Sequence, residues 1–403
     1  YYGSILAGKN FADGRGNVAV NLEYARQNSL YASQRKDLRT ANGFIVVDTD
    51  PAGTPNGSDG IPDRVFYRDI RPVTISNSGT ILFNGRSGTG AGRCGRDSTN
   101  AAFDCPYFFR PDGTLVQQTG ARAGLSPNGS LIGGNGDTLR EGQLVQILPQ
   151  LDRYSANLIA HFDVSDAFVP FIEAKYVRTN SVGQGSSGPA FFQGSTLDGL
   201  YERPRYDNPY LTDQARGVIA QQYALAGLPL TAATRIPIRR NLLDLGVRTE
   251  EAKRETYRIV GGVRGTFNGD WKYELSGNYG EFKERTKVLG NLNVQRFLLG
   301  MDAVRNAAGQ IVCGSQIDAT RANLGLTGGP DAGGNPAVLA ADIAACQPVN
   351  PFGQGNISQA AKNYVLQDTV SVGKITQLDL IGYMSGDTSQ FLTLPGGPVQ
   401  FSV

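Results

Sequence analysis

Four cysteines are the residues with the clearest chemical potential, and they fall into two neighbouring pairs: Cys94 with Cys105, and Cys313 with Cys346. Four cysteines allow three pairings. Local pairing would close loops of 12 and 34 residues, each worth about 3 to 4 kcal/mol in the chain-entropy account. With no Cys-x-x-Cys and only His161 as an imidazole, a zinc site is disfavoured. We predict the two local disulfides; free thiols would require a cytosolic protein, which nothing else indicates.

Oxygen-bearing side chains gather between residues 48 and 63. They are Asp48, Asp50, Asn56, Asp59 and Asp63. Their odd spacing around a turn-forming glycine resembles calcium-binding loops. Pro51 and Pro55 interrupt the spacing, however, and no bidentate glutamate follows. A solvated turn rich in Asp and Asn is the favoured interpretation, with a calcium site as the alternative.

Other candidate motifs are weaker. Residues 90–95 match Gly-x-Gly-x-x-Gly, but no apolar strand precedes them and no helical pattern follows, so we interpret them as loop. Arg235, Arg239 and Arg240 could bind an anionic ligand, although a solvated loop face is the favoured interpretation. His161 alternates with apolar neighbours and should face the polar side of its strand. No serine or cysteine has a plausible imidazole partner, so we expect neither an enzyme nor a cofactor.

Composition favours a large β domain. The 403 residues include 52 Gly and 20 Pro, with 40% hydrophobic and 18% charged residues, which indicates many turns and few long helices. A net charge of +2 provides no broad basic field for nucleic acid. No run of 18 apolar residues exists, which excludes a transmembrane helix but not a transmembrane strand, whose side chains alternate.

The clearest strand pattern covers residues 255–283. Tyr257, Ile259, Val263 and Phe267 alternate with polar residues, the turn 268–270 follows, and Trp271, Tyr273, Leu275 and Tyr279 continue the alternation. Each arm has about 13 residues, more than the roughly 9 to 11 that a tilted membrane strand needs. Phe267 and Trp271 flank the turn, where an aromatic girdle would meet the lipid headgroups. We therefore predict a hairpin with one apolar face.

Three further hairpins follow the same design. The second has arms over 154–162 and 168–176. In the third, Tyr2, Ser4 and Leu6 lead into a strand whose apolar side holds Val18, Val20, Leu22 and Tyr24. The fourth pairs 376–384 with 399–403 around the corner at 395–398. The opposite, water-facing side should carry Glu173, Lys175, Arg258, Arg264, Lys272 and Glu274.

Long connections separate these hairpins, at residues 28–150, 180–253 and 286–370. Helices are predicted over 213–226 with Thr212 as N-cap, over 295–306, and after Ser358. Loops of this length argue against a compact soluble domain. Short turns at one end and long loops at the other are typical of outer-membrane barrels. The predicted fold class is all-β: a partial antiparallel transmembrane β-barrel whose long extracellular loops contain short helices.

Several strings resemble the barrel domain of TonB-dependent outer-membrane receptors of sphingomonad-type and related bacteria. They are residues 10–17, 59–63, 302–304, 311–313, 346–353, 357–361 and 394–399, and they extend over most of the chain. The resemblance implies a 22-stranded barrel in the cell outer membrane, closed by an N-terminal plug and driven by the TonB complex. About eight or nine strands are visible here, without a TonB box, a plug or a C-terminal aromatic strand. We therefore expect residues 1–403 to be an internal portion of such a barrel.

This resemblance implies a transporter for active uptake of a scarce solute: a siderophore, cobalamin, a saccharide or a peptide. Its partners would be outer-membrane lipid, the plug domain of the same receptor, the TonB complex and the solute, with no nucleic acid. The ligand would bind in the three long loops. Two alternatives stay open: a passive porin or surface adhesion barrel, and a secreted β-rich binding protein. Energy-dependent uptake separates the first class from the second, and detergent-free solubility would favour the third.

Overall fold

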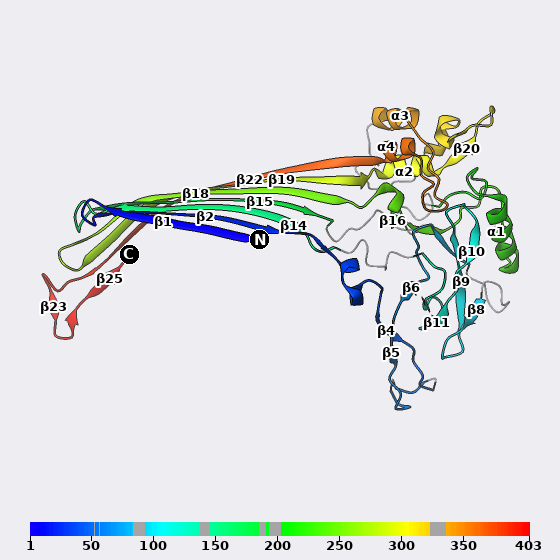
Figure 1. Ribbon diagram of the computed structural model, residues 1–403, viewed down its shortest axis with the longest axis horizontal. Coiled ribbons are helices and arrows are strands. Elements are labelled where there is room, and N and C mark those ends of the chain that lie inside the picture. The colour runs from blue at the N-terminus through cyan, green and yellow to red at the C-terminus, as the bar shows by residue number, and fades with distance from the viewer. Residues whose placement is uncertain are drawn as a thin grey trace.

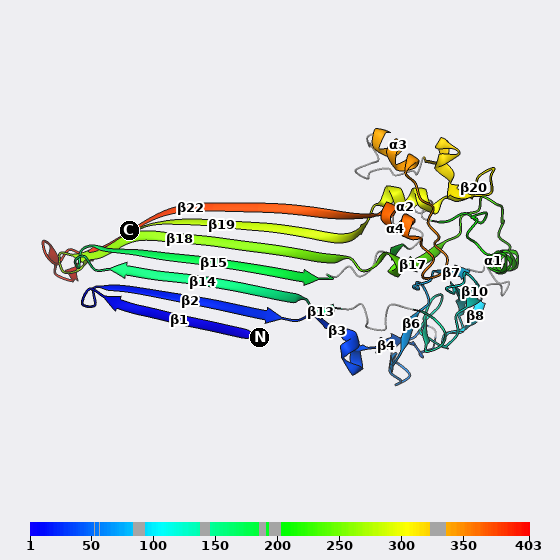
Figure 2. The ribbon, with the colours of Figure 1, turned by 45° about the horizontal axis from the view of Figure 1, so that its top comes forward.

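The dominant feature of the computed structural model is one antiparallel sheet of eight strands, most of them long (Figures 1 and 2). The structure describes residues 1–51, 53–55, 57–83, 93–137, 146–184, 191–192, 203–322 and 336–403. Half of the chain is strand and 15% is helix. In order across the sheet, the strands are β1 (Tyr2–Phe11), β2 (Gly16–Gln27), β14 (Gln150–Phe162), β15 (Val169–Gly183), β18 (Thr249–Phe267), β19 (Trp271–Leu292), β22 (Leu366–Asp387) and β25 (Gln400–Ser402).

Tight turns join the strands at one end of this sheet. Phe267 pairs directly with Trp271, so only residues 268–270 turn the chain. Asn268 and Gly269 both have positive φ, 52° and 80°, a conformation whose twist matches that of the strands it joins. Residues 12–15 make the equivalent turn between β1 and β2, and 163–168 the one between β14 and β15. β22 returns to β25 through a small hairpin, β23 (Thr393–Leu394) with β24 (Gly397–Pro398).

The long connections all lie at the other end, as predicted (Figure 2). Their bounds are 28–149, 184–248 and 293–365, so the strands extend further than the sequence pattern indicated. β18, for example, begins at Thr249 and not near 254, and β19 continues to Leu292. Near these ends both faces of the sheet carry polar side chains, and the alternation of apolar and polar residues that reveals a strand disappears.

The three connections pack together into one body, which we call the headpiece. Its strands are β3 (Leu30–Tyr31), β4 (Gly43–Val46), β5 (Arg64–Tyr67), β6 (Ile70–Pro72), β7 (Thr80–Phe83), β8 (Arg93–Arg96), β9 (Ala102–Phe109), β10 (Leu115–Gln117), β11 (Ala121–Ala123), β12 (Ser130–Ile132), β13 (Gln146–Leu148), β16 (Phe191–Phe192), β17 (Ile238–Asn241), β20 (Ala303–Arg305) and β21 (Ile311–Cys313). Its helices are α1 (Asp213–Leu225), α2 (Val294–Met301), α3 (Pro336–Ala344) and α4 (Gln359–Val365), with 3-10 turns η1 (Ala32–Gln34), η2 (Lys36–Leu38), η4 (Leu243–Leu245), η5 (Gly314–Gln316) and η6 (Ala319–Ala322).

A single hydrophobic core holds the headpiece together. It takes Ile81 and Phe109 from the first connection, Ile238 from the second, and Phe297 and Phe352 from the third, each with at most 1% of its surface exposed. The rings of Phe109 and Phe352 lie 5.0 Å apart although the residues belong to different connections. The sequence predicted three separate loops; the structure shows one packed unit.

Helices and disulfides in the headpiece follow the predictions closely. Thr212 caps α1 by accepting the Ala215 amide at 3.2 Å, and Ser358 caps α4 in the same way. Both disulfides, Cys94–Cys105 and Cys313–Cys346, are present. The helix predicted over 295–306 ends at Met301, because residues 303–305 pair with 311–313 as a short hairpin. Helix α3 was not predicted.

One buried ion pair ties all three connections together. Arg240 and Asp244, both in the second connection, have fully buried side chains and approach to 2.9 Å. The Arg240 Nε donates to the carbonyl of Asn77 in the first connection at 2.9 Å. The Asp244 carboxylate accepts the amides of Gly355 and Ile357 in the third, at 2.9 and 3.3 Å. Because both charges have several polar partners, burial is tolerated.

This arrangement corrects the interpretation of the Arg235, Arg239 and Arg240 cluster. Arg240 is 0% exposed, so it lies neither on a solvated face nor in reach of an anionic ligand. Arg235 and Arg239 are half-buried, and Arg235 donates to the carbonyl of Arg203 at 3.0 Å. The Asp244 partner is only four residues away, but the Asn77 carbonyl and the core around Arg240 come from distant segments, so the sequence could not show that Arg240 is buried.

We predict that Asp244→Ala loosens the whole headpiece. Removing one partner leaves the Arg240 charge buried and uncompensated, which costs about 3 to 5 kcal/mol. Hydrogen exchange should show faster exchange in all three connections. Asp207→Ala is the matched control, since its pair with Arg205 is partly exposed and should contribute at most about 1 kcal/mol. A loss of protection confined to the second connection after Asp244→Ala would show that the Arg240–Asp244 pair does not tie the three connections together.

Candidate functional site

The eight-stranded sheet has one apolar face that no described part of the chain covers. Register places these residues on it: Ile5, Ala7, Val18, Val20, Leu22, Ala156, Leu158, Ala160, Ile172, Ala174, Ile259, Val263, Leu275, Leu378 and Leu380. Ile259, Leu275 and Leu380 are 51%, 56% and 82% exposed. Such a surface is unfavourable in water and marks a site for a partner or a membrane.

In β1, the prediction of which side chains lie on the apolar face was wrong. Tyr2, Ser4 and Leu6 were expected beside Leu22 and Tyr24, but the structure pairs Ile5 with Leu22, and Leu6 with Asn21. Ile5, not Leu6, therefore shares the apolar face. Adjacent apolar residues make the alternation ambiguous, and a slip of one residue exchanges the two faces.

The opposite face is polar, as predicted. Register places Glu173, Lys175, Arg258, Arg264, Lys272 and Glu274 there together. Arg258 donates to Asn278 at 2.9 Å, and Asn278 donates to Asp379 at 2.9 Å, so hydrogen bonds run from strand to strand. His161 lies opposite Asn17 on this face, also as predicted. This side of the sheet suits water or a polar partner.

Aromatic residues border the apolar face at both ends. Toward the headpiece, Tyr24 and Tyr154 have ring centroids 5.1 Å apart, Tyr176 and Tyr257 are 5.0 Å apart, and Tyr279 follows on β19. We call these five the tyrosine line. Toward the turns, Phe11 lies 6.0 Å from Phe162, Phe267 lies 5.6 Å from Trp271, and Trp271 lies 4.9 Å from Phe401.

The two aromatic borders are eight residues apart on three strands and ten apart on β18, from Tyr257 to Phe267. Tyr154 and Phe162 on β14, Tyr176 and Phe168 on or next to β15, and Tyr279 and Trp271 on β19 are each eight residues apart. Eight residues of strand span about 27 Å.

The tyrosine line also slopes across the sheet. From Tyr24 to Tyr279 it crosses four strand intervals and shifts four residues toward the turns. At about 3.4 Å per residue and about 4.8 Å per strand, the slope is about 35°. The apolar band is then about 22 Å deep along its normal. Both values agree with the tilt of about 35 to 45° and the band of about 25 Å found in outer-membrane barrels.

Each of three tyrosines donates its hydroxyl to a carboxylate on the headpiece side. Tyr24 donates to Asp152 at 2.9 Å, Tyr176 to Glu255 at 3.0 Å, and Tyr279 to Glu281 at 3.0 Å. The same contact recurs on separate strands. A tyrosine at the border between an apolar and a polar zone keeps its ring on the apolar side and its hydroxyl on the polar side.

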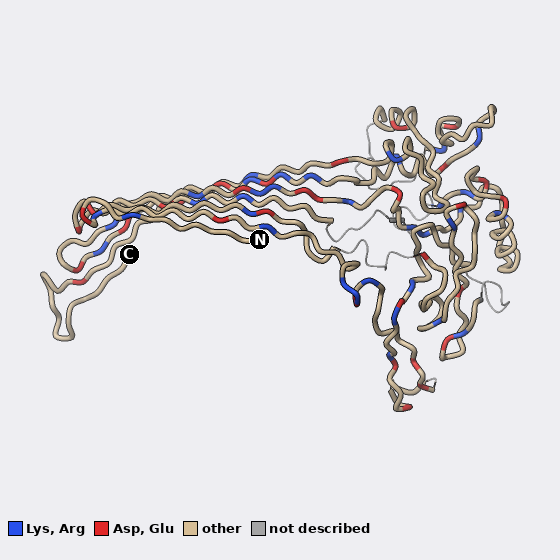
Figure 3. The backbone as a smooth tube through the Cα atoms, viewed as in Figure 1, with Lys and Arg blue, Asp and Glu red and all other residues tan. Residues whose placement is uncertain are grey.

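Basic side chains pair with these carboxylates. Arg26 lies 3.8 Å from Asp152, and Lys253 lies 2.8 Å from Glu255. Glu281 lies between Lys283 and Lys374, at 2.5 and 2.9 Å. The sheet thus changes from apolar to aromatic to charged along its strands, and Figure 3 shows acidic and basic residues interleaved toward the headpiece. This order is not visible in the sequence, since it appears only when the strands are in register.

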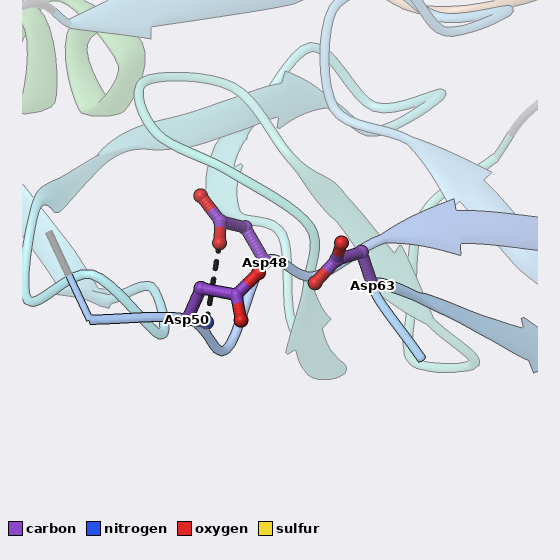
Figure 4. Close-up of side chains that lie close together, drawn as sticks. All are labelled: Asp48, Asp50 and Asp63. Atoms are coloured by element: carbon purple, nitrogen blue, oxygen red, sulfur yellow. Dashed lines mark hydrogen bonds between the residues drawn. The ribbon is translucent and has the colours of Figure 1, made fainter. Parts of the chain in front are cut away.

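The acidic loop brings three of its five predicted members together (Figure 4). Asp48, Asp50 and Asp63 each offer a carboxylate oxygen within 4.8 Å of the others. Asp59 is not part of this group, and its carboxylate accepts a hydrogen bond from the amide of Ile61 at 2.7 Å. Asn56 lies outside the described residues, as do residues 90–92 of the glycine motif; the rest of that motif begins β8.

Hydrogen bonding separates the three carboxylates. Asp50 accepts from the amides of Gly57 and Asp59 and from the Ser58 hydroxyl, at 2.5 to 2.9 Å. Burial opposes ionisation of Asp50, but these bonds outweigh it and lower its pKa. Asp63 has a buried oxygen without a hydrogen-bond partner among the described residues. Burial and then the charges of Asp50 and Asp48 raise the pKa of Asp63. The geometry would suit a cation such as calcium, which stays the alternative to a solvated turn.

No protein-family model, curated protein or solved structure matches this chain. Among the described residues, no helix is long and apolar enough to cross a membrane. The two faces of the sheet and its tyrosine line are therefore the features that point to a function.

We predict that Asp63→Asn stabilises the acidic loop at pH 7 in the presence of a chelator. A carboxyl group whose folded-state pKa is raised contributes stability only when protonated, and that contribution is lost as the pH rises through the folded pKa. The amide cannot ionise, so the variant keeps its stability. The advantage over the natural protein should vanish below about pH 3.9. Thermal unfolding or local hydrogen exchange measures the difference in stability. A variant no more stable than the natural protein at pH 7 would show that the Asp63 charge does not destabilise the loop.

Proposed function

We propose that the chain forms part of the wall of an outer-membrane β-barrel, in a TonB-dependent receptor that takes up a scarce solute. The apolar band between two aromatic borders carries the proposal. Its depth, its slope and its position on one face of an antiparallel sheet match the lipid-facing surface of such a barrel. Membrane lipid would cover the apolar face, and water or the plug domain of the same receptor would occupy the polar face.

Closure of the barrel follows from the same reasoning. In the described structure the sheet is open, with β1 and β25 at its two edges. Unpaired backbone groups have no partner in hydrocarbon, so a spanning sheet must close on itself. We propose that further strands of the receptor complete the wall.

The headpiece supports a receptor and not a passive pore. Three connections with a shared core, two disulfides and a buried ion pair make a rigid body at one end of the sheet. A preorganised surface of this kind suits capture of a ligand from outside the cell, because less ordering is needed on binding. The solute we propose is a siderophore, cobalamin, a saccharide or a peptide.

We predict that Leu275→Arg blocks membrane assembly whereas Ser276→Arg does not. The two positions are neighbours midway between Tyr279 and Trp271, and they lie on opposite faces. A lipid-facing arginine near the membrane centre costs about 2 to 4 kcal/mol, while a position on the water side tolerates it. Heat-modifiable migration and protease protection in outer membranes are the measurements. Equal assembly of the two variants would remove the membrane assignment.

A transport assay tests the second half of the proposal. Ferric siderophore, cobalamin, oligosaccharide and peptide probes would be offered to cells that produce the complete receptor, with and without a functional TonB complex. We expect one probe class to accumulate only when TonB is present. Accumulation independent of TonB would support the passive porin instead.

A further inference from the structure

Like charges face each other directly on the headpiece side of the tyrosine line. Lys283 on β19 is the register partner of Lys374 on β22, and Arg285 is the partner of Lys253 on β18. We call these four residues the cationic quartet. Directly opposed residues have Cβ atoms about 4.5 to 5.5 Å apart, and like charges at that distance are destabilising. Two such pairs in adjacent rows need a compensating anion.

The protein supplies only part of that compensation. Glu281 is shared by Lys283 and Lys374, and Glu255 pairs with Lys253. Arg285 is exposed and has no acidic partner among the described residues. The quartet therefore has four cations and two carboxylates.

The carboxylates are covered and the cations are not. Glu281 and Glu255 have 12% and 16% of their side-chain surface exposed, compared with 42% to 54% for the three lysines. An approaching molecule therefore meets ammonium and guanidinium groups first. The surface selects for anions.

The position of the quartet identifies the partner. It lies on the apolar face of the sheet, and the Lys283 ammonium reaches within 5.7 Å of the Tyr257 ring centre in the tyrosine line. On the membrane wall proposed above, this is where lipid headgroups begin. A soluble anion would contact only the four cations. A lipid would contact the cations with its headgroup and the apolar band with its acyl chains.

We propose that Lys253, Lys283, Arg285 and Lys374 bind the phosphate of an anionic lipid headgroup whose acyl chains lie along the apolar face. This inference rests on the proposed membrane location. Arg285 supplies a bidentate donor pair for phosphate oxygens, and the lysines supply point charges around it. The binding would relieve the repulsion between opposed cations.

The experiment measures lipid retention by the complete protein. Purified protein in non-ionic detergent receives phosphatidic acid or phosphatidylcholine with the same acyl chains, and native mass spectrometry counts the bound lipids. We expect preferential retention of phosphatidic acid. Each cation near a membrane surface contributes about a five-fold effect, so the double variant Arg285→Gln with Lys374→Gln should weaken the preference by about 25-fold.

A matched control removes two cations from the polar face of the same sheet, Lys175→Gln with Arg258→Gln, and should keep the preference. An inorganic phosphate arm separates lipid from generic anion binding: equal binding of inorganic phosphate alone would overturn the lipid assignment. Protease protection in outer membranes is recorded for every variant. An inserted protein without preference for phosphatidic acid refutes this inference alone, whereas a protein that does not insert refutes the proposed function as well.

Discussion

An uncovered apolar sheet face is the constraint on which the rest of this structure depends. Burial of apolar surface is the main favourable term in folding, yet Leu275 and Leu380 are more than half exposed on β19 and β22, which pair with each other over most of their length. Hydrogen bonds between strands hold the sheet, and neither face has a second protein layer among the described residues. The free energy that a soluble sheet gains from its own core must come here from the surroundings.

The ends of the strands are arranged around the same constraint. The hydroxyl of a tyrosine in the line reaches a carboxylate such as Glu281, and that carboxylate holds lysines further out. Side chains of intermediate polarity thus separate the apolar band from the charged zone. The turns at the other end need only close the strands, which Asn268 and Gly269 do with left-handed backbone that suits the strand twist.

The headpiece differs from the sheet because it has a hydrophobic core of its own, to which all three connections contribute. Together they bury Phe109, Ile238 and Phe352, and the Arg240–Asp244 pair joins their backbones. A buried ion pair contributes little net stability compared with apolar residues, but the contacts of this one join all three connections. The result is one packed headpiece at the end of the sheet opposite the tight turns.

The sequence by itself determined three of the four antiparallel hairpins, the capped helices at Thr212 and Ser358, the two disulfides and the separation of turns from loops. These depend on local spacing, on turn residues and on pairs close in the chain. The fourth hairpin was only partly right, because residues 376–383 pair with β19 and the contact with β25 begins at Met384. The sequence did not determine the face of β1, where Ile5 and Leu6 are both apolar, or the burial of Arg240. Only the tertiary structure decided those, together with the tyrosine line, the cationic quartet and the shared core. Each of them joins residues from strands or loops far apart in sequence, and register between strands comes from hydrogen-bonded pairing, which no single stretch of sequence contains.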